Sequence, residues 1–353
     1  MRGRAMFRLP AAWLAVSVSL LATSTAYGGK CALAHLPDIP VTMQDGRPVV
    51  HAQLNGTDAP FVADSGSFFT LVTPAAAHEL HLSVDPTSAL TMQWKGQDEL
   101  AQVAWVKTFT IGGQTLKNVP FAVQQGEFGH NVAGLLGQNV FPTADVEYDL
   151  ANRVIRLVQP RDCAGTPLAY WSNETHQPYS VIDIEPATAH EPHTRAVAYL
   201  NGTAIAVMFD AATAVSTLTL EAAKRAGMTP GSAGVAAAGR NGWIARFASF
   251  RIGDEEIKHV RLRFAQVDLP GVDMLIGADF FLSHRVYVAS SQRKLYFTYN
   301  GGPVFDLTAQ QAPGSALLCL LTGAPLESPA PVGSPRSRTG RMGAADFHSD
   351  QQL

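Results

Sequence analysis

The sequence predicts an all-β protein made of two homologous lobes with few short helices, and three observations lead to this prediction. The tetrapeptide LNGT occurs at 54–57 and again at 200–203, an offset of 146 residues. GLLG at 134–137 is matched by MLIG at 274–277, an offset of 140 residues. The runs around these landmarks are short, rich in β-branched and aromatic residues, and separated by Gly, Asn and Pro. Similarity repeated at a nearly constant offset indicates a duplicated structural unit.

Each repeat begins with a predicted β-hairpin and continues into a predicted short helix. Asn55-Gly56 and Asn201-Gly202 each lie between two apolar runs, and Asn-Gly is the strongest short signal for a two-residue hairpin turn. TPAAAHEL and TLEAAKRA then fall on each other in the repeat register. They predict one helix per repeat, over 74–81 and over 220–227.

The two registers also give the domain boundaries. Because the offset falls from 146 to 140, the second repeat is six residues shorter (146 − 140 = 6), mostly between residues 82 and 111 of the first. The lobes are placed at 31–163 and 179–300, with 164–178 as a connector. Residues 308–353 are rich in Pro, Ser, Gly and Gln and are expected to form a disordered tail.

The N-terminus has the pattern of a secretory signal peptide, assigned to residues 1–26. Three arginines within the first eight residues precede an apolar run at 11–22 and the small-residue sequence Ser24-Thr25-Ala26. The run is well short of the roughly 20 apolar residues that a membrane span needs, so a membrane anchor is the weaker alternative. We therefore expect an exported protein, periplasmic or secreted, with no stable membrane span.

The three cysteines become informative in an exported protein, because disulfides persist in oxidising compartments. Cys31 and Cys163 bracket the first repeat and are predicted to pair, since the ends of a domain are often close in space. Closing so long a loop stabilises the fold by about 4–5 kcal/mol in the chain-entropy model. The alternative is that all three cysteines are free thiols, and Cys319 is left over in either case.

The composition argues against several classes of partner. The net charge is −3 and only 16% of the residues are charged, without the basic stripe of a nucleic-acid-binding protein. His190 and His193 lie on either side of Pro192, which disfavours a helix that would present both to one metal ion. We expect no nucleic-acid partner, no metal and no cofactor.

Two aspartates occupy equivalent places in the repeats. Asp64 lies in FVADSGSFFTLVT and Asp210 in VMFDAATAVSTLT, and each acid follows an apolar run. A buried carboxylate is costly unless it is satisfied, so two at equivalent positions indicate a pair across a pseudo-twofold axis. Such a pair shares one proton. It can activate a water molecule with one carboxyl group and protonate a carbonyl oxygen with the other.

Around these acids the sequence resembles the aspartic proteases. Asp64-Ser65-Gly66-Ser67 resembles their Asp-Ser/Thr-Gly-Ser/Ala signature. Leu135-Leu136-Gly137 and Leu275-Ile276-Gly277 resemble the family's apolar-apolar-Gly motif, which crosses behind the catalytic loop. The resemblance covers about 35–160 and 180–300. It implies two retropepsin-like β-barrel lobes of the acid-protease fold, joined in one chain as a pepsin-like pseudo-dimer, and hence a monomer.

The resemblance also assigns roles to the signature residues. Asp64 and Asp210 would be the catalytic pair of an aspartic-type peptidase that hydrolyses a peptide or unfolded-protein substrate. Ser65 would grip the opposite loop through its hydroxyl, and Gly66 would offer its backbone N–H to the carboxylates. Ser67 and Thr213 would bind the outer oxygens of the carboxylates.

The extra length of the first repeat falls where this family has its flap hairpin. The flap is placed at about 90–105, with its tip near Lys95-Gly96-Gln97. Trp94 would then contact the substrate, or else pack within its own lobe.

The second motif, Asp210-Ala211-Ala212-Thr213, departs from the family pattern. Ala211 is expected to leave Ser65 without a hydrogen-bond acceptor, at a cost of about 1–3 kcal/mol. Ala212 is expected to strain the loop if the turn needs a conformation that only Gly adopts. Three interpretations stay open: a peptidase with weakened activity, an inactive pseudo-peptidase that binds extended peptides, and a purely structural repeat in which Asp210 is a turn residue.

Overall fold

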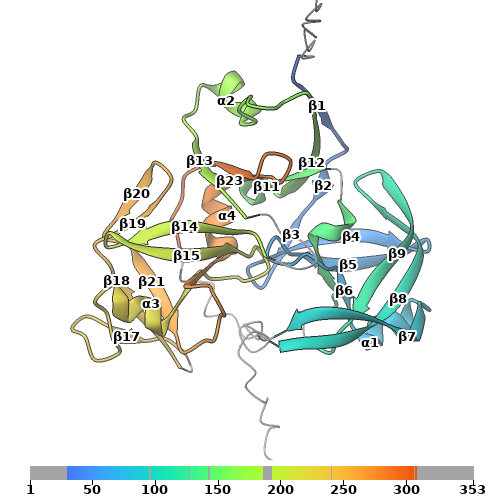
Figure 1. The fold of residues 1–353 in the computed structure, drawn as a ribbon, viewed down its shortest axis with the longest axis horizontal. Helices are drawn as coiled ribbons and strands as arrows, with labels where there is room; N and C mark the ends of the chain where they lie inside the picture. Colours follow the sequence, from blue (N-terminus) through green and yellow to red (C-terminus); the bar gives the residue numbers. More distant parts are fainter. Residues whose placement is uncertain are drawn as a thin grey trace, which may run out of the picture.

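The computed structural model describes residues 30–94, 97–126, 128–141, 144–185, 193–239, 241–305 and 307. The expected signal peptide and the expected tail from residue 308 lie outside the described residues. The described part is a two-lobed all-β molecule with a third sheet between the lobes (Figure 1). The predicted fold class is therefore confirmed.

The first lobe is an eight-stranded sheet that closes on itself. Its strand order is β3-β4-β5-β10-β6-β9-β8-β7, and an additional pairing of β4 with β8 closes six of these strands into a barrel. The elements are β3 (Thr42–Gln44), β4 (Arg47–Leu54), β5 (Thr57–Ala63), β6 (Leu71–Val72), α1 (Pro74–Glu79), β7 (Ser83–Trp94), β8 (Gln97–Ile111), β9 (Gln114–Val123), β10 (Gly134–Leu136) and η1 (Gln138–Val140).

The second lobe repeats this plan, but its longest strand has 7 residues against 15 in the first lobe. Its order is β17-β18-β21-β16-β22-β15-β14-β19-β20, so β14, β15, β16 and β22 occupy the places of β4, β5, β6 and β10. The elements are β14 (Arg195–Leu200), β15 (Thr203–Phe209), β16 (Thr217–Thr219), α3 (Leu220–Arg225), β17 (Ala236–Ala237), β18 (Gly242–Arg246), β19 (Ser249–Ile252), β20 (Glu255–Lys258), β21 (Arg261–Ala265), β22 (Met274–Ile276) and α4 (Ala278–Ser283).

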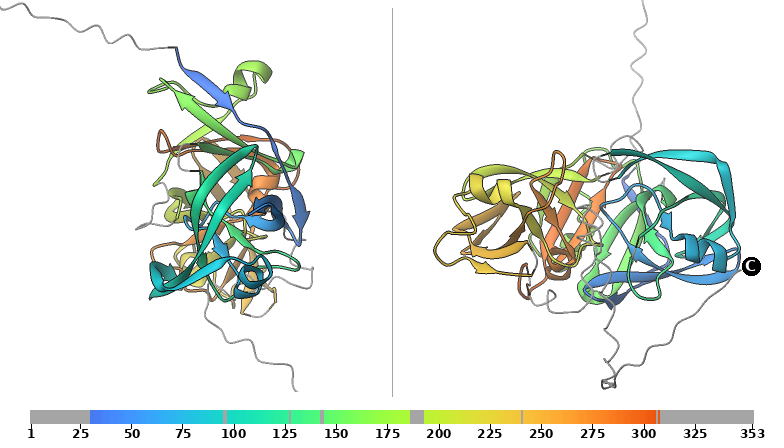
Figure 2. Two further views of the ribbon diagram at one scale, coloured as in Figure 1. Left: turned by 90° about the vertical axis from the view of Figure 1, so that its right-hand side faces the viewer. Right: turned by 90° about the horizontal axis from the view of Figure 1, so that it is seen from below.

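A sheet built from both repeats joins the lobes. Its order is β1-β12-β11-β23-β24-β13, with β2 also paired to β12, and its central pair, β11 with β23, takes one strand from each repeat. Figure 2 shows the lobes on either side of it. The elements are β1 (Ala32–His35), β2 (Ile39–Pro40), β11 (Asp145–Asp149), η2 (Leu150–Asn152), β12 (Val154–Arg161), α2 (Tyr170–Thr175), β13 (Ser180–Asp183), β23 (His284–Ala289) and β24 (Lys294–Tyr299).

The predicted hairpin turns are present in both lobes, between β4 and β5 and between β14 and β15. Asn55 and Gly56 have φ of 54° and 86°, and Asn201 and Gly202 have φ of 50° and 79°. Two successive left-handed residues match the twist of the flanking strands, and Asn and Gly adopt them at least cost. The Asn-Gly pairs therefore fix the register that carries each aspartate to the end of its strand.

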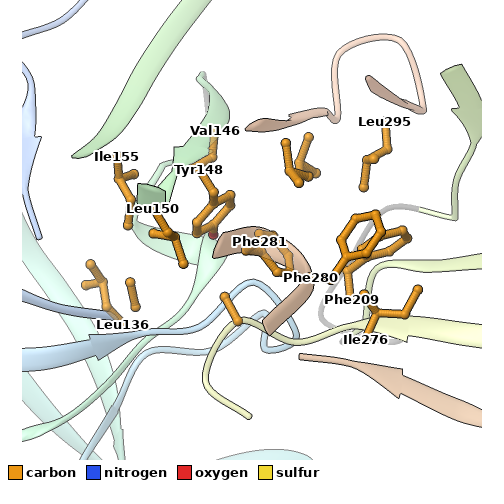
Figure 3. Close-up of a cluster of buried hydrophobic side chains, with 14 of the residues drawn as sticks. Leu136, Val146, Tyr148, Leu150, Ile155, Phe209, Ile276, Phe280, Phe281 and Leu295 are labelled. Atoms are coloured by element: carbon orange, nitrogen blue, oxygen red, sulfur yellow. The ribbon is translucent and has the colours of Figure 1, made fainter. Parts of the chain in front are cut away.

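One apolar core continues from lobe to lobe (Figure 3). Phe209 and Phe281 of the second repeat lie in it with Tyr148 and Leu150 of the first. The rings of Tyr148 and Phe281 meet edge to face at 5.3 Å. Because burial of such side chains stabilises a fold by about 1.5–3 kcal/mol each, this core holds the two lobes in a fixed relation.

A disulfide joins Cys31 to Cys163, the two cysteines paired in the sequence analysis. It ties the N-terminal end of β1 to the residues that follow β12, across a sequence separation of 132 residues. We expect Cys31→Ala/Cys163→Ala to lower the free energy of unfolding by about 2–4 kcal/mol. Urea denaturation of the variant beside oxidised wild type measures this. An unchanged midpoint would show that the bond adds nothing to the pairing of β1 with β12.

The connector between the lobes carries α2 and docks on the joining sheet. Trp171 is buried, and its indole N–H donates to the hydroxyl of Thr298 in β24 at 2.9 Å.

No helix in the described part of the chain is long and apolar enough to cross a membrane.

Candidate active site

Each aspartate directly follows a strand, and its amide is held by the last residue of the parallel neighbouring strand. β10 runs parallel to β5, and the amide of Asp64 donates to the carbonyl oxygen of Leu136 at 3.0 Å. β22 runs parallel to β15, and the amide of Asp210 donates to the carbonyl oxygen of Ile276 at 2.9 Å. The apolar-apolar-Gly strands therefore fix both acids from behind in the same way.

The glycine that ends each of these strands is required by close packing. A Cβ on Gly137 would lie 2.5 Å from the carbonyl carbon of Phe69, and one on Gly277 would lie 2.5 Å from the carbonyl oxygen of Thr213. Both obstacles are backbone atoms of the aspartate loops, which cannot move aside. This explains why the motif needs Gly in both repeats.

Asp64 and Asp210 lie together where the lobes meet. They are 7% and 6% exposed, and a Cβ on Gly66, two residues after Asp64, would lie only 2.9 Å from the Cβ of Asp210. Burial, and then the charge of Asp210, raise the pKa of Asp64 well above its usual range. Two buried carboxyl groups that interact in this way hold one proton between them.

The loops offer the two carboxylates different numbers of hydrogen bonds. Asp64 accepts from the amide of Gly66 at 2.8 Å, and the amide of Ser67 also faces it. Asp210 accepts from the amide of Ala212 at 3.0 Å, the amide of Thr213 at 3.1 Å and the hydroxyl of Thr213 at 2.7 Å. The loop with the altered motif is thus the one that surrounds its carboxylate more completely.

Ser65 is only 1% exposed, and its hydroxyl binds the opposite loop. It donates to the carbonyl oxygen of Phe209 at 3.2 Å and accepts from the amide of Ala211 at 2.9 Å. The expectation that Ala211 would leave Ser65 without an acceptor was wrong, because both partners are backbone atoms. A backbone carbonyl and amide are present whatever side chain stands at position 211.

We expect Ser65→Ala to lower the free energy of unfolding by about 1–3 kcal/mol, because two buried hydrogen bonds between the lobes are lost. Ser67→Ala is the matched control. The Ser67 hydroxyl donates only to the nearby carbonyl oxygen of Phe69, at 3.0 Å, and we expect a change below about 0.5 kcal/mol. Denaturant titration of both variants measures the difference; equal effects would contradict a special role for Ser65.

Two further expectations about the loops need correction. The Ser67 hydroxyl was expected to bind the outer oxygen of Asp64, but it bonds to Phe69, so only the amide of Ser67 faces the acid. Ala212 was expected to strain its loop, but it is not among the residues in the left-handed region. Its methyl group is fully buried in an apolar cluster of the first lobe that includes Phe128. The methyl group therefore fills a packing site.

The start of β14 supports the first loop through contacts that the sequence did not reveal. His193 Nδ1 lies 2.6 Å from the carbonyl oxygen of Gly66. Because a carbonyl only accepts, Nδ1 carries the proton in this contact. Gln138 donates to the carbonyl oxygen of Ser65 at 2.7 Å and to the hydroxyl of Thr194 at 3.0 Å. These bonds clamp the Asp64 loop between the two lobes.

A polar pair behind each loop completes the support. In the first lobe Thr70 donates its amide and hydroxyl to Asn139 Oδ1, each at 2.8 Å. In the second lobe Ser216 donates its amide at 3.0 Å and its hydroxyl at 2.6 Å to Asp279 Oδ1. An acid thus stands where the first lobe has an amide, and burial raises the pKa of Asp279 to about 7.

This acid is expected to make stability depend on pH. The folded protein keeps the proton of Asp279 up to about pH 7, whereas an unfolded chain releases it near pH 4. Stability from this group is therefore complete below about pH 4 and is lost as the pH rises to about 7. We expect Asp279→Asn to remove this dependence and to stabilise the protein at pH 8 by up to about 4 kcal/mol.

Denaturation midpoints at pH 5 and pH 8 test the prediction, with Asp254→Asn, on an exposed turn, as the control. A variant that keeps the wild-type pH dependence would contradict it.

The predicted flap corresponds to the long hairpin of β7 and β8, in which Trp94 pairs with Gln97 in the strand register. Lys95 and Gly96 lie outside the described residues, as does the side chain of Trp94. The choice between substrate contact and packing for Trp94 thus stays a prediction. In the described part of the chain, no group of three or more His, Cys, Asp or Glu side chains is arranged to hold a metal ion.

Comparison with known proteins supports the family resemblance in the first lobe. Residues 50–140, which include Asp64 and Gly137, match the family model described as aspartyl protease. A search of curated proteins found no match. Among solved structures, basic 7S globulin from soybean has 11% identity and a TM-score of 0.48 over 79% of this chain and 99% of its own. Aspartic proteinase from Irpex lacteus has 13% identity and a TM-score of 0.48 over 79% and 100%. The family match confirms the resemblance to the aspartic proteases over residues 50–140.

Proposed function

We propose that the protein is an aspartic endopeptidase that hydrolyses peptide bonds with a water molecule activated by Asp64 and Asp210. The observation that carries the proposal is the pair of buried, interacting carboxyl groups held on two symmetry-related loops. The Ala211-Ala212 sequence does not remove a group that the reaction needs, because the donors to Asp210 and the partners of Ser65 are intact.

The arrangement suits general acid–base chemistry. A carboxylate takes a proton from water as the water oxygen attacks the peptide carbonyl carbon, and the protonated carboxyl group gives its proton to the carbonyl oxygen. Tyr148 lies in the core near both acids, and burial, together with their charges, raises its pKa, so it stays neutral during the reaction. Tyr148 therefore exchanges no proton with the dyad.

Cleavage of an unfolded protein by the purified chain, measured from pH 3 to pH 7, tests the proposal. We expect activity in part of this range, because a carboxyl pair that shares a proton is active in its singly protonated form. No cleavage at any pH by a folded chain that still binds extended peptides would instead establish a pseudo-peptidase, the alternative that the missing hydroxyl at Ala211 favours.

We further propose that the enzyme acts after export and as a monomer. The signal-peptide pattern and the disulfide both suit an oxidising compartment, the periplasm or the exterior. One chain supplies both aspartates, so the site needs no second copy. Cell fractionation and sedimentation of the purified protein test the two statements; cytoplasmic retention or an obligate dimer would contradict them.

A further inference from the structure

Arg263, in the middle of β21, is a buried cation that no carboxylate of the described residues pairs with. It is 9% exposed, and its Nη1 donates to the hydroxyl of Thr217 at 3.2 Å. Burial lowers the pKa of Arg263, and no acid in the described part of the chain opposes this effect. Because a guanidinium has five N–H donors and stays charged, most of its donors remain available to a ligand. Burying a charge without a partner is costly, so the position calls for an anion.

The hairpin of β17 and β18 covers one side of this guanidinium. A Cβ on Gly242 would lie 2.7 Å from Nη2 of Arg263, so the backbone of β18 passes directly over the group. Farther along, Ile244 is the register partner of Arg263, and Ala236 is the register partner of Ile244. Ile244 is half-buried and Ala236 is exposed. The sheet surface therefore opens to solvent beyond Arg263, past a small side chain.

The place of Arg263 relative to the dyad follows from the first lobe. There a row of adjacent side chains crosses the sheet, on the face opposite the main core. Register pairs on neighbouring strands place its members side by side, and they are Val49, Val62, Leu135, Leu71 and Ala122. All of them share an apolar cluster with Ala212, two residues after Asp210. This first row therefore faces the aspartate loop of the opposite lobe.

The second lobe has the equivalent row, with different chemistry. Its members, in the same order across the strands, are Arg195, Met208, Leu275, Thr217 and Arg263. By the repeat symmetry this second row faces the loop of Asp64. Arg195 is paired with Glu185 at 3.0 Å, whereas Arg263 has no such partner within the described residues. The two walls beside the dyad thus differ, one being apolar and the other carrying an unpaired cation.

We propose that Arg263 forms a carboxylate-binding subsite, so that preferred substrates carry Asp or Glu at one fixed place relative to the cleaved bond. This inference rests on the proposed function. A carboxylate matches the planar fork of a guanidinium and can accept two parallel hydrogen bonds from it. Thr217 is a positioning residue in this subsite. Its hydroxyl donates to the carbonyl oxygen of Val215 at 3.1 Å, which leaves its oxygen to accept from Arg263 and to hold the fork in place.

The first test determines which sequences the enzyme cleaves. A mixture of peptides from an unfolded proteome is digested at about pH 5.5, where Asp and Glu side chains are ionised, and the cleaved sites are identified by mass spectrometry. We expect Asp or Glu to be enriched about tenfold at one position, because hydrogen bonds between charged groups are strong. Arg263→Met should lose the enrichment, and Arg263→Lys should keep part of it.

Arg261→Met is the matched control, because Arg261 lies two residues earlier on the same strand and is exposed. It should keep the wild-type preference. Acid enrichment that persists in Arg263→Met would overturn the proposal. So would a wild-type enzyme that cleaves without preferring an acid, even if Arg263→Met failed to fold.

The second test needs no turnover and so separates this inference from the proposed function. Immobilised Asp64→Asn is offered a library of random eight-residue peptides, acetylated and amidated at their ends, so that side chains supply the only carboxylates. The captured peptides should be rich in Asp and Glu, and adding Arg263→Met should remove this preference. Acid selection by a wild-type chain that cleaves nothing would overturn the proposed function alone. Capture without acid preference, no capture at all, or capture only of peptides with a free C-terminal carboxylate would overturn the subsite.

Stability distinguishes a ligand site from a structural role for Arg263. A cation kept for a ligand is buried without a partner in the free protein, so Arg263→Met should leave the denaturation midpoint unchanged or raise it. A lower midpoint in a variant that keeps the acid preference would show that Arg263 serves the fold, and it would overturn the proposal.

Discussion

Asp64→Asn and Asp210→Asn are each expected to lower kcat/KM for a peptide substrate by about 10⁴-fold, with the protein still folded. Each change preserves the shape of the side chain but removes either the acid or the base, and general acid–base groups contribute up to about 10⁴-fold each. Because the two residues act as a unit, the double variant should be no worse than either single variant. Initial rates of cleavage at the optimal pH measure the effect.

Measuring the stability of both variants distinguishes a loss of catalysis from a loss of folding. Asp64→Asn removes the buried carboxyl group whose pKa is raised, and Asp210→Asn removes the charge that helps to raise it, so both variants should unfold at a higher denaturant concentration at pH 7. Asp183→Asn is the control, because the Asp183 side chain is 88% exposed and pairs with Lys294 on the surface. Substantial activity in either dyad variant would exclude the two-carboxylate mechanism.

The repeat in the sequence was sufficient to predict the pairing of Asp64 with Asp210 and the architecture that brings them together. An Asn-Gly turn has few conformations, and a turn at equal distances before each acid places both at equivalent strand ends. The close packing of Gly137 and Gly277 against the aspartate loops was also predictable from residue type, since only Gly fits at these positions. Features set by backbone geometry were thus predictable from residue type and spacing.

The contacts of the loops across the lobes were not predictable in this way. Ser65 binds a backbone carbonyl and a backbone amide of the other repeat, and no residue type in the sequence marks such partners. His193 contacts Gly66 across 127 residues, and Arg47 contacts Phe128 across 81. Each of these depends on how two finished lobes dock. The expected loss of a hydrogen bond at Ala211 and the expected strain at Ala212 were wrong for the same reason.

Gly66→Ala is expected to lower activity by about 10³-fold, whereas the reverse change at the equivalent position, Ala212→Gly, should lower it less than about threefold. A Cβ on Gly66 would lie 2.9, 3.1 and 3.2 Å from the Cβ, Cγ and Cα of Asp210. Since these atoms belong to the backbone and the side-chain stem of Asp210, they cannot rotate away. The added methyl group must therefore move the two carboxyl groups apart, and a displacement of about 1 Å can cost 10²-fold or more.

Ala212 occupies the position equivalent to Gly66 in the second repeat, but its surroundings have room for a methyl group. Its methyl group already occupies a site in the apolar cluster with Phe128, and its amide already donates to Asp210. Removing the methyl group should cost about 1 kcal/mol of stability and leave the dyad geometry in place. Cleavage rates and denaturation midpoints of both variants decide the matter. If Ala212→Gly were as inactive as Gly66→Ala, the second loop would need its methyl group for catalysis; if Gly66→Ala were fully active, the loops would be less closely apposed than the structure places them.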